Sequence, residues 1–260
     1  MSFVAGGKVR FSAPEDSRLV FLPQTGIFVP MKDTLPAMNV FPYGAAETRY
    51  LSRRDPRLGR VIEAIGPVVR PVWPDLFGAL CRSIIGQQIS NRAAATVVER
   101  FDALLGEPTP QRVLEADPSA LRSCGMSLRK VGYIRSAAAA VLDGTLDVAA
   151  LRELPDAEVV RKLTALPGIG VWTAEMLMIF SLQRPDVLSY DDLIVRRSLM
   201  RLHGLSGLDR TRFAAFRERY SPFGSVASLY LWEMAAEPWR DLVRCGPDGV
   251  EVVGTQREER

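Results

Sequence analysis

From about residue 54 to residue 242, apolar side chains recur at the three- and four-residue spacing of amphipathic helices. Roughly ten such segments follow one another, separated by proline, glycine or residues that cap helices. One of them is expected to begin at Ser127 and end at Gly144, and an earlier one to begin at Ser90 or Asn91. Because each apolar stripe must be buried against a neighbouring helix, we predict a mostly α fold.

Both ends of the chain lack this spacing. Near the N-terminus, RLVFLP and GIFVPM are short apolar runs broken by proline and glycine, which predict two edge strands of a small sheet or an extended arm. The C-terminal end reads as a turn, a short strand and a solvated segment. We therefore divide the chain into an N-terminal extension (1–48), a helical domain (49–245) and a tail (246–260).

The composition excludes several classes of protein. With 260 residues, 47% of them hydrophobic, the chain can bury a sizeable core and is not intrinsically disordered. It has no apolar run of 18 residues and no apolar leader, so we expect a cytoplasmic protein, nucleoid-associated if its source is bacterial, with no membrane contact. The net charge of +3 permits a nucleic-acid partner but does not require one.

Cysteine and histidine offer no catalytic or metal-binding cluster. Cys81, Cys124 and Cys245 stand far apart, which fits neither a disulfide framework nor a metal knuckle, and we expect buried or inert thiols. The single histidine, His203, lies near the end of an expected helix, and we interpret it as structural or solvated.

The sharpest local signal is LPGIGVWTA at residues 166–174, where two glycines bracket an apolar residue and lead into a helix. Gly168 and Gly170 have no side chains, so a ligand can approach their backbone closely. The unpaired N–H groups at the start of a helix favour an anion. The preceding helix, PDAEVVRKLTAL, completes a helix-hairpin-helix, which can hold a DNA phosphate without reading sequence. The alternative is a glycine-rich turn that binds nothing.

Two adjacent acids, Asp191 and Asp192, follow the hairpin by about twenty residues in SYDDLIVRR. One of them is expected to cap the next helix, and capping is the plain alternative for both. A second carboxylate beside a phosphate site repels DNA unless it stabilises a positive charge that forms during reaction. Such a charge forms on the sugar when a base leaves deoxyribose, and a preorganised carboxylate stabilises that cation and can orient water.

With these features in place, the chain resembles the helix-hairpin-helix (HhH-GPD) DNA glycosylase superfamily, and within it the AlkA and yeast-Mag type of DNA-3-methyladenine glycosylase. The resemblance runs from about residue 50 to 242 and is carried by SIIGQQIS (83–90), SLRKVGYIRSAA (127–138), LPGIGVWTAEM (166–176), SYDDLIVRR (189–197) and SVASLYLWEM (225–234). It implies two helical subdomains with a cleft between them. It also implies a monomeric base excision repair enzyme that hydrolyses the N-glycosidic bond of alkylated bases flipped out of double-stranded DNA.

The resemblance assigns the catalytic aspartate to Asp192, with Asp191 as its neighbour and possible cap. Members of the superfamily with lyase activity carry a lysine where this chain has Trp172. Because no Schiff base can form on the sugar without an amine, the resemblance implies a monofunctional enzyme that uses water.

The resemblance also places Trp172 and Trp232 in the base pocket, where aromatic faces suit a cationic alkylated base. Met176 follows Trp172 by one helical turn and either faces the same pocket or is a core methionine. For Trp73 and Trp239 we expect ordinary packing.

The predicted DNA-binding residues are Gly168, Gly170, Thr173, Gln87, Gln88 and Arg197. Gln88 fits the position of the wedge that fills the gap left by a flipped base, whereas Gln87 either inserts with it or supports the fold.

No cofactor is expected to be required. The superfamily often holds a monovalent cation, Na⁺ or K⁺, on hairpin carbonyls, which correspond here to those of Thr164, Leu166 and Ile169. An iron–sulfur cluster is not expected, because no group of four cysteines is present.

Two alternatives stay open: a non-catalytic helix-hairpin-helix module that docks on DNA, and a glycosylase of different base specificity or with lyase activity. Asp192 and the two pocket tryptophans favour a glycosylase over a docking module, and Trp172 counts against lyase activity.

Overall fold

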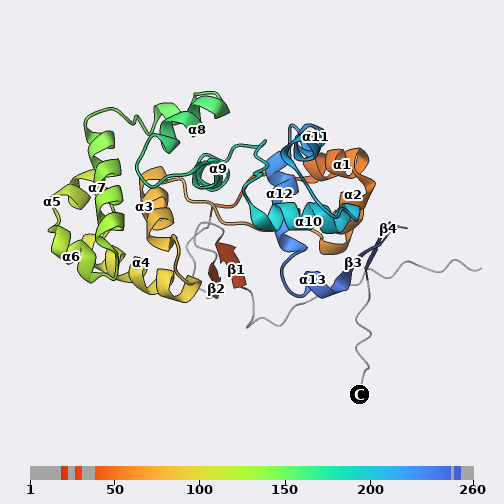
Figure 1. The fold of residues 1–260 in the computed structure, drawn as a ribbon, viewed down its shortest axis with the longest axis horizontal. Coiled ribbons are helices and arrows are strands. Elements are labelled where there is room, and N and C mark those ends of the chain that lie inside the picture. The colour runs from red at the N-terminus through yellow and green to blue at the C-terminus, as the bar shows by residue number, and fades with distance from the viewer. Residues whose placement is uncertain (1–18, 23–26, 31–38, 247–248, 253–260) are drawn as a thin grey trace, which may run out of the picture.

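The structure is a computed structural model that describes residues 19–22, 27–30, 39–246 and 249–252. This part of the chain contains thirteen α-helices, one 3-10 helix (Ala150–Arg152) and two two-stranded sheets. The predicted mostly α fold is confirmed. The helices form two groups that lie side by side, with a helical hairpin between them (Figure 1).

One group is a continuous stretch of chain and occupies the left of Figure 1. Its helices are α3 (Leu76–Gly86), α4 (Asn91–Leu105), α5 (Pro110–Glu115), α6 (Pro118–Ser123) and α7 (Leu128–Leu142). The two expected serine caps are present: Ser90 accepts a hydrogen bond from the backbone of Ala93, and Ser127 accepts one from Lys130. The side-chain hydroxyls thus satisfy N–H groups that the helix itself leaves free.

The other group combines both ends of the helical region, so that residues far apart in sequence share one lobe. Its helices are α1 (Ala45–Arg54), α2 (Pro56–Ile65), α10 (Leu193–His203), α11 (Arg210–Tyr220), α12 (Gly224–Glu233) and α13 (Trp239–Leu242). The sequence did not predict α1, because Leu51 is its only buried residue and the helix has no apolar stripe.

Helices α8 (Asp156–Thr164) and α9 (Val171–Phe180) form the hairpin between the two groups (Figure 1). Helix α9 packs against both α8 and α3. It is apolar nearly all round, which is the pattern of a helix buried within a core. The buried side chains of both groups form one continuous apolar cluster, and this cluster fixes the hairpin relative to each lobe.

Two short antiparallel hairpins complete the described chain. Strands β1 (Leu19–Leu22) and β2 (Ile27–Pro30) pair within the predicted extension, which confirms the expectation of short strands there. Strands β3 (Val243–Gly246) and β4 (Gly249–Val252) pair at the C-terminal end, and β4 packs against α2. The expected strand of the tail is therefore present, and the solvated end expected after it lies outside the described residues.

Cys81 and Cys124 are buried free thiols, and burial raises the pKa of each. Cys245 is partly buried, with a pKa that burial also raises. The expectation of inert thiols is consistent with these shifts, because the thiolate is the reactive form. No helix in the described ranges is both long and apolar enough to cross a membrane.

Candidate active site

The turn between α8 and α9 requires glycine at Gly168. Its φ is +84°, a conformation that residues with a side chain rarely adopt. A Cβ atom there would also lie 2.2 Å from Cδ2 of Tyr133 on α7. Both constraints arise inside the protein, so Gly168 is needed for the shape of the turn whether or not a ligand binds.

Gly170, in contrast, is not required by anything within the described structure. Its φ is −90°, and an added Cβ would meet no atom within 4 Å. It is the N-cap residue of α9, where no side chain accepts a hydrogen bond from the first turn. The first N–H groups of an α-helix have no partner within the helix, so this exposed helix start suits an anion.

The segment that follows α3 is attached to this hairpin. Gln87 donates a hydrogen bond from Nε2 to the carbonyl oxygen of Gly168 at 2.8 Å. Lys130 on α7 donates to the carbonyl oxygens of Ile85 and Gln87 at 2.7 and 2.6 Å. These contacts connect the predicted wedge segment to the predicted phosphate site, and they favour the supporting role for Gln87.

Gln88, the predicted wedge, is exposed and has a φ of +58°. A non-glycine residue in this region stores strain, which occurs often where a side chain must be presented to a ligand. The next residue, Ile89, is also exposed, to 37% of its surface. Ile89 was not among the residues predicted to bind DNA, although an apolar residue between Gln88 and a capping serine was a usable signal.

Asp192 is the N-cap of α10 and is only 5% exposed. Its Oδ1 accepts a hydrogen bond from the backbone of Val195 at 2.8 Å, and its Oδ2 accepts one from the indole Nε1 of Trp172 at 3.0 Å. The carboxylate is therefore not committed wholly to its own helix. Its second oxygen faces the start of α9, and this contact brings the predicted catalytic residue and one predicted pocket residue together.

The suggestion that Asp191 caps α10 was wrong, because Asp192 holds that position. Asp191 is exposed and forms an ion pair with Arg210 at 3.2 Å. The guanidinium groups of Arg210 and Arg196 also lie over the ring of Tyr190, at 4.2 and 4.9 Å from its centroid. These contacts involve the two residues of the turn that directly precede Asp192.

The remaining predicted pocket residues lie deeper than expected. Trp172 is partly buried, but Trp232 is 3% exposed and packs against Phe180 at 5.7 Å between ring centroids. Met176 is fully buried, as expected if it is a core methionine. The pocket role of Trp232 and Met176 stays a prediction. Trp73 packs edge-on against Phe180, at 6.3 Å between centroids, which is the ordinary packing that we expected.

The other predicted DNA-binding residues differ in exposure. Arg197 on α10 is exposed and has no partner among the described residues, so its guanidinium is available to a phosphate. The side chain of Thr173 is buried, so it is the backbone N–H in the first turn of α9 that can contact DNA.

Helix α9 carries one acid, Glu175, that was not among the predicted site residues. Glu175 follows Trp172 by three residues, so the two side chains share a face of the helix. A lone carboxyl within VWTAEMLMIF was the available signal, because an otherwise apolar helix has no obvious use for a charge.

The three carbonyls predicted to hold a monovalent cation all belong to the α8–α9 hairpin. That of Leu166 accepts a hydrogen bond from the backbone of Ile169 at 3.2 Å, and a carbonyl oxygen has a second lone pair that can bind a cation. The carbonyls of Thr164 and Ile169 complete the proposed set. Across the described ranges, no cluster of histidine, cysteine or acidic side chains could hold a metal ion.

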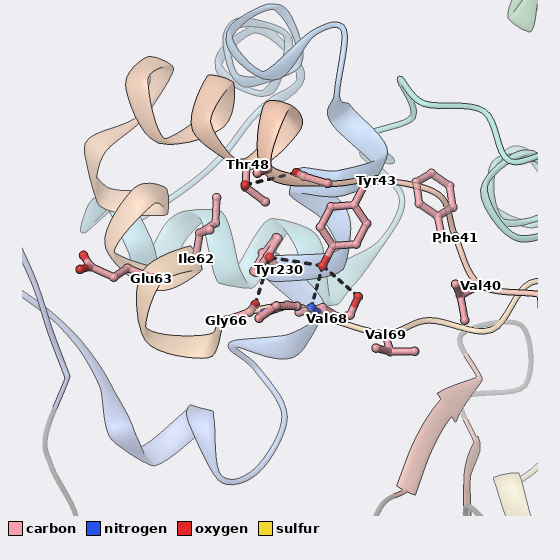
Figure 2. A pocket seen from close by; sticks show the side chains of 13 residues that line it. Val40, Phe41, Tyr43, Thr48, Ile62, Glu63, Gly66, Val68, Val69 and Tyr230 are labelled. Atoms are coloured by element: carbon pink, nitrogen blue, oxygen red, sulfur yellow. Dashed lines mark hydrogen bonds between the residues drawn. The ribbon is translucent and has the colours of Figure 1, made fainter. Parts of the chain in front are cut away.

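A separate cavity of about 460 Å³ lies in the lobe that also contains α10, between α1, α2 and α12 (Figure 2). The hydroxyls of its two tyrosines are already hydrogen-bonded within the protein. The hydroxyl of Tyr43 accepts from the backbone of Val68 at 2.6 Å and donates to its carbonyl at 2.9 Å. The hydroxyl of Tyr230 donates to the carbonyl of Gly66 at 3.0 Å. We therefore assign the cavity no part in the chemistry.

His203 at the end of α10 has a structural role, which was one of the two roles, structural or solvated, expected from the sequence. Its Nε2 lies 3.0 Å from Oδ2 of Asp55, and its ring packs against Phe216. Asp55 in turn caps α2, so this contact fastens the end of α10 to the start of α2.

A family model described as HhH-GPD superfamily base excision DNA repair protein matches residues 81–222. DNA-3-methyladenine glycosylase 1 of Schizosaccharomyces pombe is 32% identical over 192 residues, covering 71% of this chain and 84% of that protein. DNA-3-methyladenine glycosylase 2 of Escherichia coli is 33% identical over 186 residues, covering 67% of this chain and 63% of that protein. This chain thus spans less than two thirds of the length of the Escherichia coli relative.

Two solved structures show the same arrangement of helices. A DNA-3-methyladenine glycosidase from Bacillus halodurans aligns with a TM-score of 0.71 and 36% identity, covering 78% of this chain and 95% of that chain. The Schizosaccharomyces pombe 3-methyladenine DNA glycosylase, solved in complex with abasic DNA, aligns with a TM-score of 0.64 and 31% identity, covering 74% of this chain and 97% of that chain.

Proposed function

The chain belongs to the HhH-GPD superfamily of base excision DNA repair proteins, and from this premise we propose that it is a monofunctional DNA glycosylase for alkylated bases. Its substrate in this proposal is double-stranded DNA with a base of the 3-methyladenine type, on which it acts as a monomer. The names of its curated relatives support this base class. The abasic DNA bound to one structural relative supports DNA as the partner.

The observation that carries the proposal is the division of the Asp192 carboxylate between two partners. One oxygen caps α10, while the other accepts a single hydrogen bond, from Trp172. A capping residue needs only the first contact. The second holds the carboxylate in a fixed direction beside a partly exposed aromatic ring, which is the arrangement needed to stabilise a sugar cation next to a bound base.

In the proposed reaction, the start of α9 binds a DNA phosphate through backbone N–H groups, and Gly170 leaves room for that phosphate. Gln88 enters the space left in the duplex when the damaged base rotates out. Arg197 adds a further phosphate contact. These groups position the sugar without reading the DNA sequence.

The chemical step breaks the bond between C1′ of the sugar and the nitrogen of the base. The electron pair of this bond moves to the base and neutralises its positive charge, so an alkylated purine leaves without a dedicated acid. Asp192 stabilises the cation that forms at C1′ and orients water for attack on it. The water loses one proton to the carboxylate or to solvent, and the products are a free base and an abasic site.

An amine nucleophile has no place in this mechanism. Trp172 stands where lyase-active members of the superfamily have lysine. The amine of Lys130 is held by the carbonyls of Ile85 and Gln87. A monovalent cation on the carbonyls of Thr164, Leu166 and Ile169 would add positive charge to the phosphate site, and the proposal assigns it no chemical step.

The test is a base-release assay on methylated duplex DNA, with separate detection of free bases and of strand breaks. We expect release of 3-methyladenine, breaks only after alkali, and no covalent complex in the presence of borohydride. Binding without release would support the non-catalytic docking module instead. A trapped adduct would show that the enzyme is a lyase and would contradict the monofunctional assignment.

A further inference from the structure

Glu175 is an acidic residue with no part in the proposed mechanism. It lies beside Trp172 and Asp192, which do take part. It shares a face of α9 with Trp172, whose indole binds Asp192. The rest of α9 after Trp172 is apolar apart from the buried Thr173. An acid at this depth needs a compensating role, because burial disfavours its charge.

Two polar atoms near this position are buried and lack a hydrogen-bond partner of full geometry. They are Oε2 of Glu175 and Oγ of Ser189. The two groups are near enough that the Ser189 hydroxyl lowers the pKa of the Glu175 carboxyl. Buried polar atoms without partners are rare in folded proteins, and those that occur need an explanation.

The pair connects α9 to the turn that carries Asp192. Ser189 is fully buried and precedes Asp192 by three residues, while Glu175 follows Trp172 by the same interval. The Trp172–Asp192 hydrogen bond joins these two segments at one point, and a hydrogen bond between Glu175 and Ser189 would join them at a second point nearby. Two contacts fix the orientation of the Ser189–Asp192 turn relative to α9, whereas a single hydrogen bond allows the two segments to rotate about it.

The surroundings of Glu175 raise its pKa, and burial is the main cause. The carboxylates of Asp191 and Asp192 raise it further. The Ser189 hydroxyl and the guanidinium of Arg217 act in the opposite direction, but the net shift is upward. In its neutral form, Glu175 can donate a hydrogen bond to Ser189 without adding negative charge beside the DNA.

We propose that Glu175 is a positioning residue for base release, which holds the Ser189–Asp192 turn against α9 so that Asp192 keeps its direction toward Trp172. The inference rests on the proposed function, because it assigns Glu175 a part in the same reaction. Glu175 contacts neither the sugar nor the base in this account and acts only through Ser189 and Asp192.

The test compares Glu175→Ala, Glu175→Gln and the control Glu115→Ala, an exposed glutamate on α5. Single-turnover release is measured with enzyme in excess, and affinity is measured on abasic DNA. We expect Glu175→Ala to slow release about tenfold or more, the size typical of a lost orienting contact, with affinity within about twofold. Glu175→Gln keeps the hydrogen-bonding shape and should recover most of the rate. Any change in the wild-type rate at a pH above the range in which glutamate ordinarily titrates should be absent from the pH–rate profile of Glu175→Gln.

A second measurement does not depend on activity. The indole N–H resonance of Trp172, assigned with Trp172→Phe, reports its hydrogen bond to Asp192. We expect this resonance to move in Glu175→Ala and to stay in place in Glu175→Gln and Glu115→Ala. An unmoved resonance in a folded Glu175→Ala protein would overturn the inference. So would equal rate losses in Glu175→Ala and Glu175→Gln. If the wild type releases no base, the proposed function fails, and the resonance alone decides the role of Glu175.

Discussion

Helices α2 and α10 both begin at a buried aspartate, but the two carboxylates differ in how they use their second oxygen. Asp55 is 2% exposed and Asp192 is 5% exposed, and each caps its helix with Oδ1. The second oxygen of Asp55 lies 2.7 Å from the hydroxyl of Tyr220, 3.0 Å from His203 and 3.5 Å from Arg219. The second oxygen of Asp192 accepts one hydrogen bond, from Trp172.

This difference separates a structural acid from one that can act on a ligand. Burial alone would raise the pKa of Asp55, but hydrogen bonds from His203 and Tyr220 and the backbone contacts lower it to about 2. Groups within the protein therefore stabilise its negative charge. Asp192 has no cationic partner among the ion pairs of the described residues, so its charge is available to a cation that forms outside it.

The largest expected effect is on catalysis by Asp192→Asn. Asparagine caps helices as well as aspartate does, so the start of α10 should stay intact. Loss of the charge should slow base release about a hundredfold or more, the size typical of a removed transition-state contact. Single-turnover release and DNA affinity should be measured together. If Asp192→Asn released bases at close to the wild-type rate, Asp192 would have no catalytic role and would not differ in this respect from Asp55.

The matched change, Asp55→Asn, should act on stability instead. It removes the charge that holds Tyr220, His203 and Arg219, and we expect a loss of about 1–3 kcal/mol in the free energy of unfolding. Denaturant unfolding measures this loss, and base release by the folded fraction should be unchanged. A slower chemical step in Asp55→Asn would indicate that the two acids do not have separate roles.

The same comparison predicts a pH dependence of stability. The pKa of Asp55 is lower in the folded protein, about 2, than its ordinary value of 3.8. Its contribution is therefore complete above about pH 4 and is lost as the pH falls toward 2. Unfolding curves of wild type should show this loss over that interval, and those of Asp55→Asn should be flatter there. Parallel curves for the two proteins would contradict the assignment.

A smaller effect is expected at the hairpin, where the two glycines provide a matched pair. Gly170→Asp should weaken binding to any DNA about tenfold, because a carboxylate at the start of α9 opposes a phosphate. Its stability should change little, since an added Cβ meets no neighbour within 4 Å. Gly168→Ala should instead cost about 1–3 kcal/mol of stability through its positive φ and the ring of Tyr133. Unchanged binding in Gly170→Asp would exclude the phosphate site.

Local features of this fold could be predicted from the sequence because neighbouring residues determine them. The caps at Ser90 and Ser127 depend on a hydroxyl and the next three residues, and the glycine hairpin depends on residues 166–174. Helix α1 could not be predicted in this way, because Leu51 is its only buried residue.

The arrangement of the site depends on contacts between distant segments, and the sequence indicated only part of it. The catalytic role of Asp192 stays a prediction from the sequence, and its hydrogen bond to Trp172 and its position as the cap became apparent only in three dimensions. The burial of Trp232 against Phe180 likewise depends on how α9 and α12 pack. The proximity of Glu175 and Ser189 has no motif, because neither residue is unusual in its own segment.

The central claim is that Asp192 stabilises a sugar cation, whereas the start of α9 only binds phosphate. The direct test is the affinity for duplexes that contain either a cationic pyrrolidine or a neutral tetrahydrofuran in place of the abasic sugar. Wild type should bind the cationic duplex about tenfold or more tightly than the neutral one, as expected for a transition-state analogue. This preference should disappear in Asp192→Asn and persist in Gly170→Asp, which should bind both duplexes more weakly. A preference that survives in Asp192→Asn would contradict the account.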